Sequence, residues 1–184
     1  MRLEDKGLAD NIMVRALFPG TFDPIHYGHM DIASRASRLF DEVVMAVYDK
    51  PLKSLMFSPE ERIGLVTEAF KDNPKIKVMG YSGLTIEFAR QIDAQVITRG
   101  LRVFSDFEFE FRMGLANQRL ASDIETVAFI TAEQHTFLSS STVKEIASLQ
   151  GNVSSMVPPH VEKALKIKVS NMGDGHSPPN ALRD

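Results

Sequence analysis

The amino-acid sequence predicts an α/β fold, in which a doubly wound parallel sheet of five strands carries helices on both faces. Three observations support this prediction. The chain has 184 residues, of which 43% are hydrophobic and 24% are charged, as expected for one globular domain. Short apolar runs rich in Val, Ile or Phe occur five times along it. Patterns with helical period separate these runs, and such alternation favours a parallel sheet with right-handed crossovers.

The five expected strands are short. They cover residues 16–18, 43–48, 76–81, 95–98 and 126–131. Because ligands bind beyond the carboxyl ends of the strands in such sheets, the residues that follow each strand are the first candidates for a functional site.

Helix-start signals and apolar spacing indicate the helices. The helix after the first strand carries apolar residues on one face, namely Ile32, Ala33, Ala36 and Leu39. Capping boxes open two further helices, at Ser58 and at Ser105, each with a glutamate three residues later. Two more helices are expected over residues 140–149 and 161–168, and Gly151 ends the first of them.

The distribution of apolar residues predicts three segments. Residues 1–13 form a flexible N-terminal extension, residues 14–169 the folded domain, and residues 170–184 a disordered tail. The tail holds two glycines, two prolines and few apolar side chains. Burial there cannot offset the cost of ordering the backbone, which is about 1–2 kcal/mol per residue.

Composition excludes several classes of protein. With 21 Lys and Arg against 24 Asp and Glu, the net charge is −3, which argues against a partner that is nucleic acid or an anionic membrane. The absence of Cys excludes disulfides, thiolate nucleophiles and Cys-ligated zinc, and it fits a cytoplasmic protein. No apolar run reaches the roughly 18 residues of a membrane span, so we expect no membrane partner.

The stretch after the first expected strand is the strongest functional signal. It reads Gly-Thr-Phe-Asp-Pro over residues 20–24, continues through His26, Gly28 and His29, and enters a helix. Free backbone N–H groups and the positive dipole end of a helix attract anions. Gly28 lets a ligand approach the backbone closely, and His29 adds a donor beside it. A single histidine is usually structural, but this context predicts a phosphate site.

Two further groups of polar residues follow later strands. Arg99 and Arg102 can aim two guanidinium groups into one crevice, unless one of them pairs with Asp106 or Glu108. Residues 139–142 read Ser-Ser-Ser-Thr at a helix start. They form a second candidate anion site, although simple N-capping explains one of these hydroxyls.

These motifs resemble the signature of the nucleotidylyltransferase superfamily, whose members share a Rossmann-like domain and join a nucleoside monophosphate to a phosphate-bearing acceptor. Within it, the chain is most similar to the bacterial phosphopantetheine adenylyltransferases, from about residue 15 to residue 168. Three motifs carry this narrower resemblance: Lys53 ahead of Met-Phe-Ser-Pro-Glu-Glu-Arg at 56–62, Arg-Gly-Leu-Arg at 99–102, and Ser-Ser-Ser-Thr-Val-Lys-Glu at 139–145.

The resemblance implies roles for single residues. The implied catalytic residues are Thr21, His29, Lys53 and Arg102. The implied acceptor contacts are Thr21, Lys53, Thr85 and Arg99. The implied ATP contacts are Thr21, Phe22, His29, Gly100, Leu101, Arg102, Glu110, His135, Thr136, Phe137, Leu138, Ser139, Ser140 and Ser141. By residue type alone, Lys53 and Glu110 are ordinary solvated charges.

The implied reaction is adenylyl transfer from ATP to 4′-phosphopantetheine, which yields dephospho-CoA and pyrophosphate in coenzyme A biosynthesis. We expect the acceptor phosphate to attack the α-phosphorus in line without a covalent intermediate, so that positioning and charge stabilisation provide the rate. Mg²⁺ is expected on the ATP phosphates, with no metal site built from protein ligands. The resemblance further implies a homohexamer that is inhibited by coenzyme A.

Three alternatives remain open. A relative that acts on nicotinamide mononucleotide or glycerol phosphate would share His26 and His29, but it is not expected to combine them with Lys53 and Arg-Gly-Leu-Arg at 99–102. A non-enzymatic nucleotide-binding regulator would lack pyrophosphate release. A fragment of a tRNA synthetase would need greater length and a basic surface.

Overall fold

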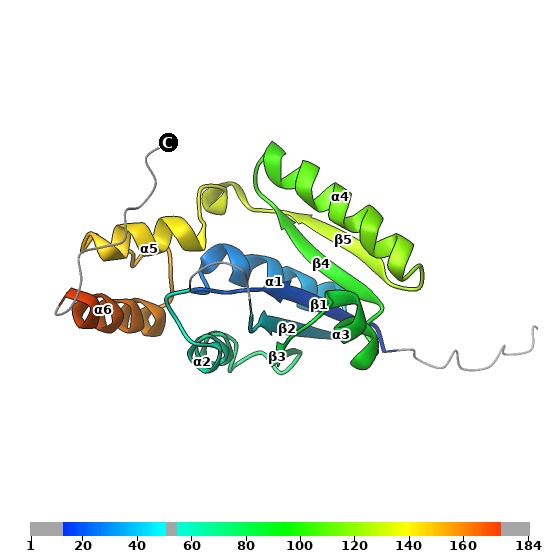
Figure 1. The fold of residues 1–184 in the computed structure, drawn as a ribbon, viewed down its shortest axis with the longest axis horizontal. Coiled ribbons are helices and arrows are strands. Elements are labelled where there is room, and N and C mark those ends of the chain that lie inside the picture. Colours follow the sequence, from blue (N-terminus) through cyan, green and yellow to red (C-terminus); the bar gives the residue numbers. More distant parts are fainter. Residues whose placement is uncertain (1–12, 51–54, 174–184) are drawn as a thin grey trace, which may run out of the picture.

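The structure is a computed structural model that describes residues 13–50 and 55–173 (Figure 1). Its elements are β1(Arg15–Gly20), α1(Tyr27–Leu39), β2(Glu42–Tyr48), α2(Pro59–Ala69), β3(Ile76–Tyr81), α3(Thr85–Gln91), β4(Val96–Leu101), α4(Phe104–Leu120), β5(Glu125–Ile130), the 3-10 turn η1(Glu133–His135), α5(Ser140–Ser148) and α6(Pro159–Gly173).

The sheet has the predicted architecture. Its five strands lie in the order β3-β2-β1-β4-β5, and every neighbouring pair is parallel. The chain builds outward from β1 in one direction to β3 and then in the other direction to β5, so the winding reverses between β1 and β4. In such sheets this reversal leaves a crevice at the carboxyl ends of the two strands.

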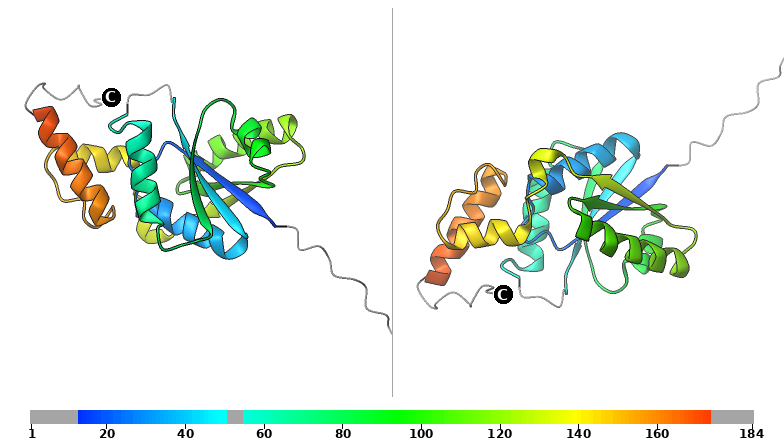
Figure 2. Two further views of the ribbon diagram at one scale, coloured as in Figure 1. Left: turned by 90° about the horizontal axis from the view of Figure 1, so that it is seen from below. Right: turned by 90° about the horizontal axis from the view of Figure 1, so that it is seen from above.

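Helices cover both faces of the sheet, which confirms the doubly wound prediction (Figure 2). One buried cluster joins α1, α2, α5 and α6 to the strand residues Ala16, Phe18 and Met45. The opposite cluster joins α3 to Leu17 and Val44, which alternate with those strand residues along β1 and β2. Because both faces are buried, the central strands are apolar almost throughout, and this is why they are so evident in the sequence.

The helix α4 differs from the others, because it lies along β4 and β5 but contains no buried residue. It stands at the opposite end of the molecule from α5 and α6, which contact each other (Figure 1). No helix in residues 13–50 and 55–173 is long and apolar enough to cross a bilayer.

The capping box predicted at Ser58 is confirmed, and the one predicted at Ser105 is wrong. The Ser58 hydroxyl accepts the Glu61 N–H at 3.2 Å, and the Glu61 carboxylate accepts the Ser58 N–H at 2.7 Å. In contrast, α4 begins at Phe104 after Val103, which forms no side-chain cap. Instead, the carboxylate of Asp106 accepts the backbone N–H of Arg102, which precedes the helix, at 3.1 Å.

Three further predictions are corrected. Leu39 is 70% exposed rather than on the buried face, because it ends α1 and the next residue, Phe40, packs on the core instead. β4 continues to Leu101 through pairing with β5, so Arg99 lies on the strand and not after it. The last helix extends to Gly173, so residues 170–173 are helical and belong to the domain. Residues 1–12 and 174–184, predicted to be flexible, lie outside the described residues.

Candidate active site

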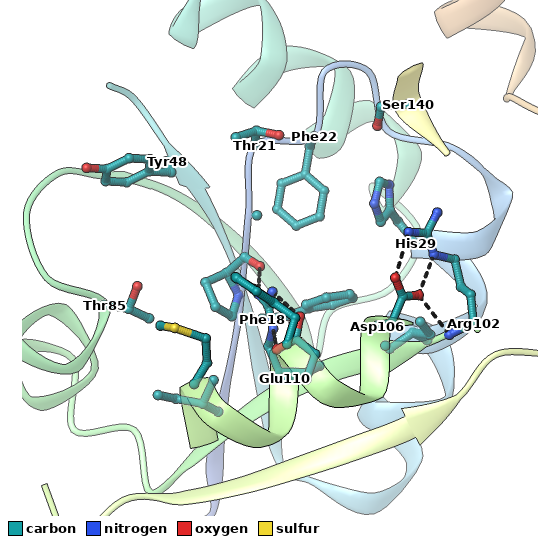
Figure 3. Close-up of a pocket in the computed structure, with 18 of the residues that line it drawn as sticks. Phe18, Thr21, Phe22, His29, Tyr48, Thr85, Arg102, Asp106, Glu110 and Ser140 are labelled. Atoms are coloured by element: carbon teal, nitrogen blue, oxygen red, sulfur yellow. Dashed lines mark hydrogen bonds and ion pairs between the residues drawn. The ribbon is translucent and has the colours of Figure 1, made fainter. Parts of the chain in front are cut away.

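A cavity of about 660 Å³ lies at the carboxyl ends of β1 and β4, where the winding reverses (Figure 3). Its walls come from the β1–α1 turn, the first turn of α1, the end of β4, the inner face of α4, the loop before α3 and the start of α5. Several elements distant in sequence therefore contribute polar groups to one space.

The start of α1 is closed by a capping box that two histidines form. His26 is the N-cap residue, and its Nδ1 accepts the backbone N–H of His29 at 3.4 Å. The Nδ1 of His29 in turn accepts the backbone N–H of His26 at 3.4 Å. The two rings stack with centroids 3.7 Å apart. Both rings are thereby oriented before any ligand binds.

This arrangement determines the protonation of both rings. Burial, together with the nearby charges of Arg102 and His135, lowers the pKa of His26 to about 3, so this residue is neutral at pH 7. Neutrality suits its place as an acceptor at a helix N-terminus. Because Nδ1 of His29 accepts a hydrogen bond, a neutral His29 carries its proton on Nε2. His29 is thus a hydrogen-bond donor in the wall of the cavity.

The residues before the capping box form a compact turn. Phe22 has a left-handed backbone with φ 48°, an uncommon conformation for a residue with a side chain. Its ring is 2% exposed and packs edge-on against Phe18 and His29, with centroids 5.7 and 5.0 Å apart. The Phe22 side chain therefore supports His29 as well as lining the cavity.

The fully buried Arg62 of α2 holds the chain at this edge of the sheet. Its guanidinium donates to the backbone carbonyl oxygens of Thr21 at 2.8 Å, Tyr48 at 2.7 Å and Phe57 at 3.3 Å. Burial lowers the pKa of Arg62, and the nearby carboxylates of Asp23 and Asp49 oppose that shift. Arg62 thus ties the turn that carries Thr21 to the end of β2.

The two arginines of the β4 segment are both engaged in ion pairs. Arg99 binds Glu110 through two hydrogen bonds of 2.7 and 2.6 Å and donates to the Pro19 carbonyl at 2.9 Å. Arg102 pairs with Asp106 at 3.0 Å and donates to the Leu138 carbonyl at 2.7 Å. The pairing of Arg102 with Asp106 is one of the alternatives considered from the sequence.

These pairs set the charge of the α4 wall. Partial burial raises the pKa of Asp106, but hydrogen bonds from the side chain and backbone of Arg102 outweigh it and lower the pKa overall. Asp106 is therefore ionised at neutral pH. The cavity presents two arginines whose charges are balanced by carboxylates on the same helix, α4.

Ser139 begins α5, as predicted. Its hydroxyl accepts the Thr142 N–H at 3.0 Å and contacts the Thr142 hydroxyl at 2.8 Å. The Ser140 hydroxyl donates to the Pro24 carbonyl at 2.9 Å, so it joins α5 to the β1–α1 turn. N-capping thus accounts for Ser139. Ser139, Ser140 and Ser141 all line the cavity, so the start of α5 borders it.

Two glycines at the cavity lie close to neighbouring side chains. A Cβ at Gly100 would lie 2.3 Å from Cδ1 of Ile32, so the absence of a side chain lets α1 pack closely on β4. A Cβ at Gly28 would lie 3.1 Å from the His26 ring. The sequence prediction that Gly28 serves close ligand approach is compatible with this, but the His26 ring is the neighbour that the structure identifies.

The comparisons with known proteins agree with this geometry. Residues 17–146 match the model of the cytidylyltransferase-like family. The chain is 53% identical over 154 residues to a phosphopantetheine adenylyltransferase of Roseiflexus sp. (strain RS-1), covering 84% of this chain and 96% of that protein. The chain belongs to the phosphopantetheine adenylyltransferase family. It is likewise similar to family members from Desulfitobacterium hafniense (strain DSM 10664 / DCB-2) and Burkholderia mallei (strain SAVP1), at 51% and 47% identity. These matches cover 83% and 90% of this chain, and 94% and 99% of the relatives.

The cavity brings together most of the residues that the family resemblance singled out. Those lining it are Thr21, Phe22, His29, Thr85, Arg99, Gly100, Arg102, Glu110, Ser139, Ser140 and Ser141. Those outside its wall are Leu101, His135, Thr136, Phe137 and Leu138. Among these, Leu138 is buried and offers its carbonyl to Arg102, whereas Phe137 is 61% exposed. Lys53 lies outside the described residues.

Three residues that shape the site were missed as site residues in the sequence. They are His26, Asp23 and Arg62, and all three are buried. The His-x-Gly-His spacing could have suggested a capping box at His26, because the two histidines stand three residues apart. Nothing local signals Arg62, whose acceptors are backbone carbonyls of three other segments.

Proposed function

We propose that this chain is a nucleotidyltransferase that transfers the adenylyl group of ATP to 4′-phosphopantetheine, giving dephospho-CoA and pyrophosphate in coenzyme A biosynthesis. The observation that carries the proposal is the 47–53% sequence identity to phosphopantetheine adenylyltransferases over nearly the whole length of those proteins. The cavity supports it, because its size suits two phosphate-bearing substrates and two helix N-termini border it.

The transfer proceeds by direct in-line attack. An oxygen of the acceptor phosphate forms a bond to the α-phosphorus of ATP while the bond from that phosphorus to the bridging oxygen of pyrophosphate breaks. A phosphate dianion is already a nucleophile, so no general base is required. The neutral His26 and the capped His29 support this route, since the site then acts through placement and hydrogen-bond donation.

The roles divide along the cavity. His29 and Thr21 stabilise the charge on the α-phosphate, and Arg102 with the start of α5 binds the leaving pyrophosphate. To do so, Arg102 exchanges part of its contact with Asp106 for phosphate. This exchange costs little free energy, because the Arg102 side chain is 34% exposed and ion pairs at such exposed sites are weak. Arg99 and Thr85 contact the acceptor, and Lys53 binds the attacking phosphate, a role that rests on the resemblance alone.

We further propose that Mg²⁺ arrives with ATP. In the described part of the chain, no group of three His, Asp or Glu side chains could hold a metal ion. Mg²⁺ retains several waters and is commonly bound through substrate phosphates, so phosphate oxygens would supply its ligands. When bound, it reduces the repulsion between the ATP phosphates and the incoming acceptor. The lack of Cys supports a cytoplasmic location for the reaction.

A homohexamer and inhibition by coenzyme A complete the proposal. The helix α4 carries exposed apolar side chains that are typical of a subunit contact, namely Phe104, Phe107, Phe111 and Leu115, and the last three line a second cavity beside β4 and β5. A second copy of this chain would cover them. Coenzyme A contains the whole product structure with one further phosphate, so it would occupy the same cavity. Sedimentation of the full chain, alone and as Phe107→Asp, tests the assembly, with dissociation expected for the variant.

Pyrophosphate release measures the proposed activity. With ATP and Mg²⁺ present, 4′-phosphopantetheine should support release, whereas nicotinamide mononucleotide and glycerol phosphate should not. Equal or faster release with nicotinamide mononucleotide would assign a different acceptor. No release with any acceptor, at protein concentrations where ATP binds, would favour a nucleotide-binding regulator.

A further inference from the structure

A buried carboxylate in the β1–α1 turn connects three parts of the molecule. Asp23 is 1% exposed. One of its oxygens accepts the backbone N–H groups of Phe57 at 2.9 Å and Met56 at 3.2 Å. The other oxygen accepts the Met56 N–H at 3.0 Å and the ammonium of Lys144 at 2.6 Å.

Two of the three connected segments line the cavity, and the third leads into α2. Asp23 stands two residues after Thr21, in the turn that also carries Phe22. Met56 and Phe57 lead into α2, and Met56 follows Lys53 by three residues in the sequence. Lys144 lies in α5, whose first residues line the cavity.

A second contact joins two of these segments. The Ser140 hydroxyl donates to the Pro24 carbonyl at 2.9 Å, next to Asp23 in the chain. The start of α5 is therefore fastened to the turn at two points, through Ser140 and through Lys144. A carboxylate that is removed from water must be paired, and here backbone and ammonium donors surround it. The junction is consequently rigid.

We infer that Asp23 and Lys144 are positioning residues, which set the distance between the β1–α1 turn, where Thr21 lines the cavity, and the start of α5. This inference rests on the proposed adenylyl transfer. In-line attack between two phosphates requires the reacting atoms to be held close and aligned, and a displacement of about 1 Å costs on the order of 10²-fold in rate. Loosening the junction should therefore lower kcat more than it raises KM.

The test compares Lys144→Met with Lys166→Met. Lys166 forms an ion pair of the same length, 2.6 Å, but with Glu162 on its own helix and with its side chain 73% exposed. For Lys144→Met, kcat is expected to fall by about 10–100-fold while KM for ATP and for phosphopantetheine changes by less than about threefold. Lys166→Met should match the wild type, and Lys144→Arg should recover most of the lost kcat.

A second variant distinguishes a loss of positioning from a loss of folding. Removing Lys144 alone leaves a buried carboxylate with less compensation, which destabilises the fold. The double variant Asp23→Asn/Lys144→Met removes both charges and should fold with the same deficit in kcat. A folded variant with kcat within threefold of the wild type would overturn the inference. A rise in KM for ATP above tenfold at unchanged kcat would also overturn it, because Lys144 would then bind the nucleotide directly.

Amide hydrogen exchange separates this inference from the proposed function. The N–H groups of Met56 and Phe57 should exchange faster in Lys144→Met than in Lys166→Met, since both depend on the placement of Asp23. An inactive wild-type protein would refute the adenylyl transfer and leave this comparison intact. Equal exchange in the two variants would show that no junction couples α5 to the segment before α2.

Discussion

On the β1–α1 side of the cavity, two stacked histidines cap the start of a helix, whereas the β4–α4 side is built from ion pairs that water reaches. His26 is 3% exposed and stacks on its capping partner His29. In contrast, the side chains of Arg99 and Arg102 are 28% and 34% exposed and pair with carboxylates of α4. The two histidines hold each other through the capping box, while the two arginines are held by carboxylates of α4.

Because of this difference, we expect the two sides to contribute differently to the reaction. A donor whose ring is oriented by a capping box, as His29 is, requires no rearrangement when charge develops on a bound phosphate. An arginine held by a partly exposed carboxylate contributes charge and can change partner at little cost. We therefore expect substitutions on the β1–α1 side to act on kcat or on stability, and substitutions on the β4–α4 side to act on substrate capture.

The largest effect is expected for His29→Ala. Loss of one donor to the transition state typically lowers the rate by about 10²–10³-fold, and KM for either substrate should change little. Steady-state pyrophosphate release measures both constants. His160→Ala is the matched control, because His160 contacts the Leu65 carbonyl, far from the cavity wall. A His29→Ala protein with near wild-type kcat would place the transition-state donor elsewhere.

A smaller effect is expected for Glu110→Gln. The variant weakens the two charge-assisted hydrogen bonds that orient Arg99, so kcat/KM for phosphopantetheine should fall about tenfold, with a smaller change for ATP. Glu108→Gln removes another glutamate of α4 that pairs with an arginine, Arg112, at the exposed surface, and it should have no measurable effect. Equal effects of the two substitutions would show that the pairing of Glu110 with Arg99 does not contribute to acceptor capture.

The smallest effect concerns the pH dependence of stability. The pKa of His26 is about 3 in the folded protein and 6.5 in the reference state, so between these pH values the unfolded chain binds one more proton. The free energy of unfolding is therefore highest above pH 6.5 and falls as pH decreases. This residue should account for about 1 kcal/mol between pH 6.5 and about pH 5.5.

Urea denaturation at several pH values checks this expectation. His26→Asn retains an N-cap acceptor but has no group that titrates in this range, so its unfolding free energy should depend less on pH. If the wild type and His26→Asn had parallel pH profiles, folding would not lower the pKa of His26. Burial of the neutral ring would then not contribute to the pH dependence of stability.

Much of the fold could be predicted because the signals are local. The segment β2 is an apolar run that is buried on both faces of the sheet, whereas the edge strands β3 and β5 are less buried. For all three, the predicted ranges differ from the observed strands by no more than a residue at either end. Ser58 was identified as a helix start because its capping partner Glu61 is three residues away. The same local pattern occurs at Ser105, but the predicted capping box does not form there. The helix begins at Phe104, and Asp106 interacts with Arg102.

The sequence by itself determined the family, the sheet and the position of the β1–α1 turn with its two histidines, since each depends on motifs whose residues are close together in the chain. Only the tertiary structure decided which carboxylate pairs with which arginine, that β4 extends through Arg99, and that Asp23 meets Lys144 across 121 residues. The reason is physical. Periodicity and capping follow from the geometry of a short backbone segment, whereas a buried ion pair depends on how separate elements pack and leaves no periodic pattern in the sequence.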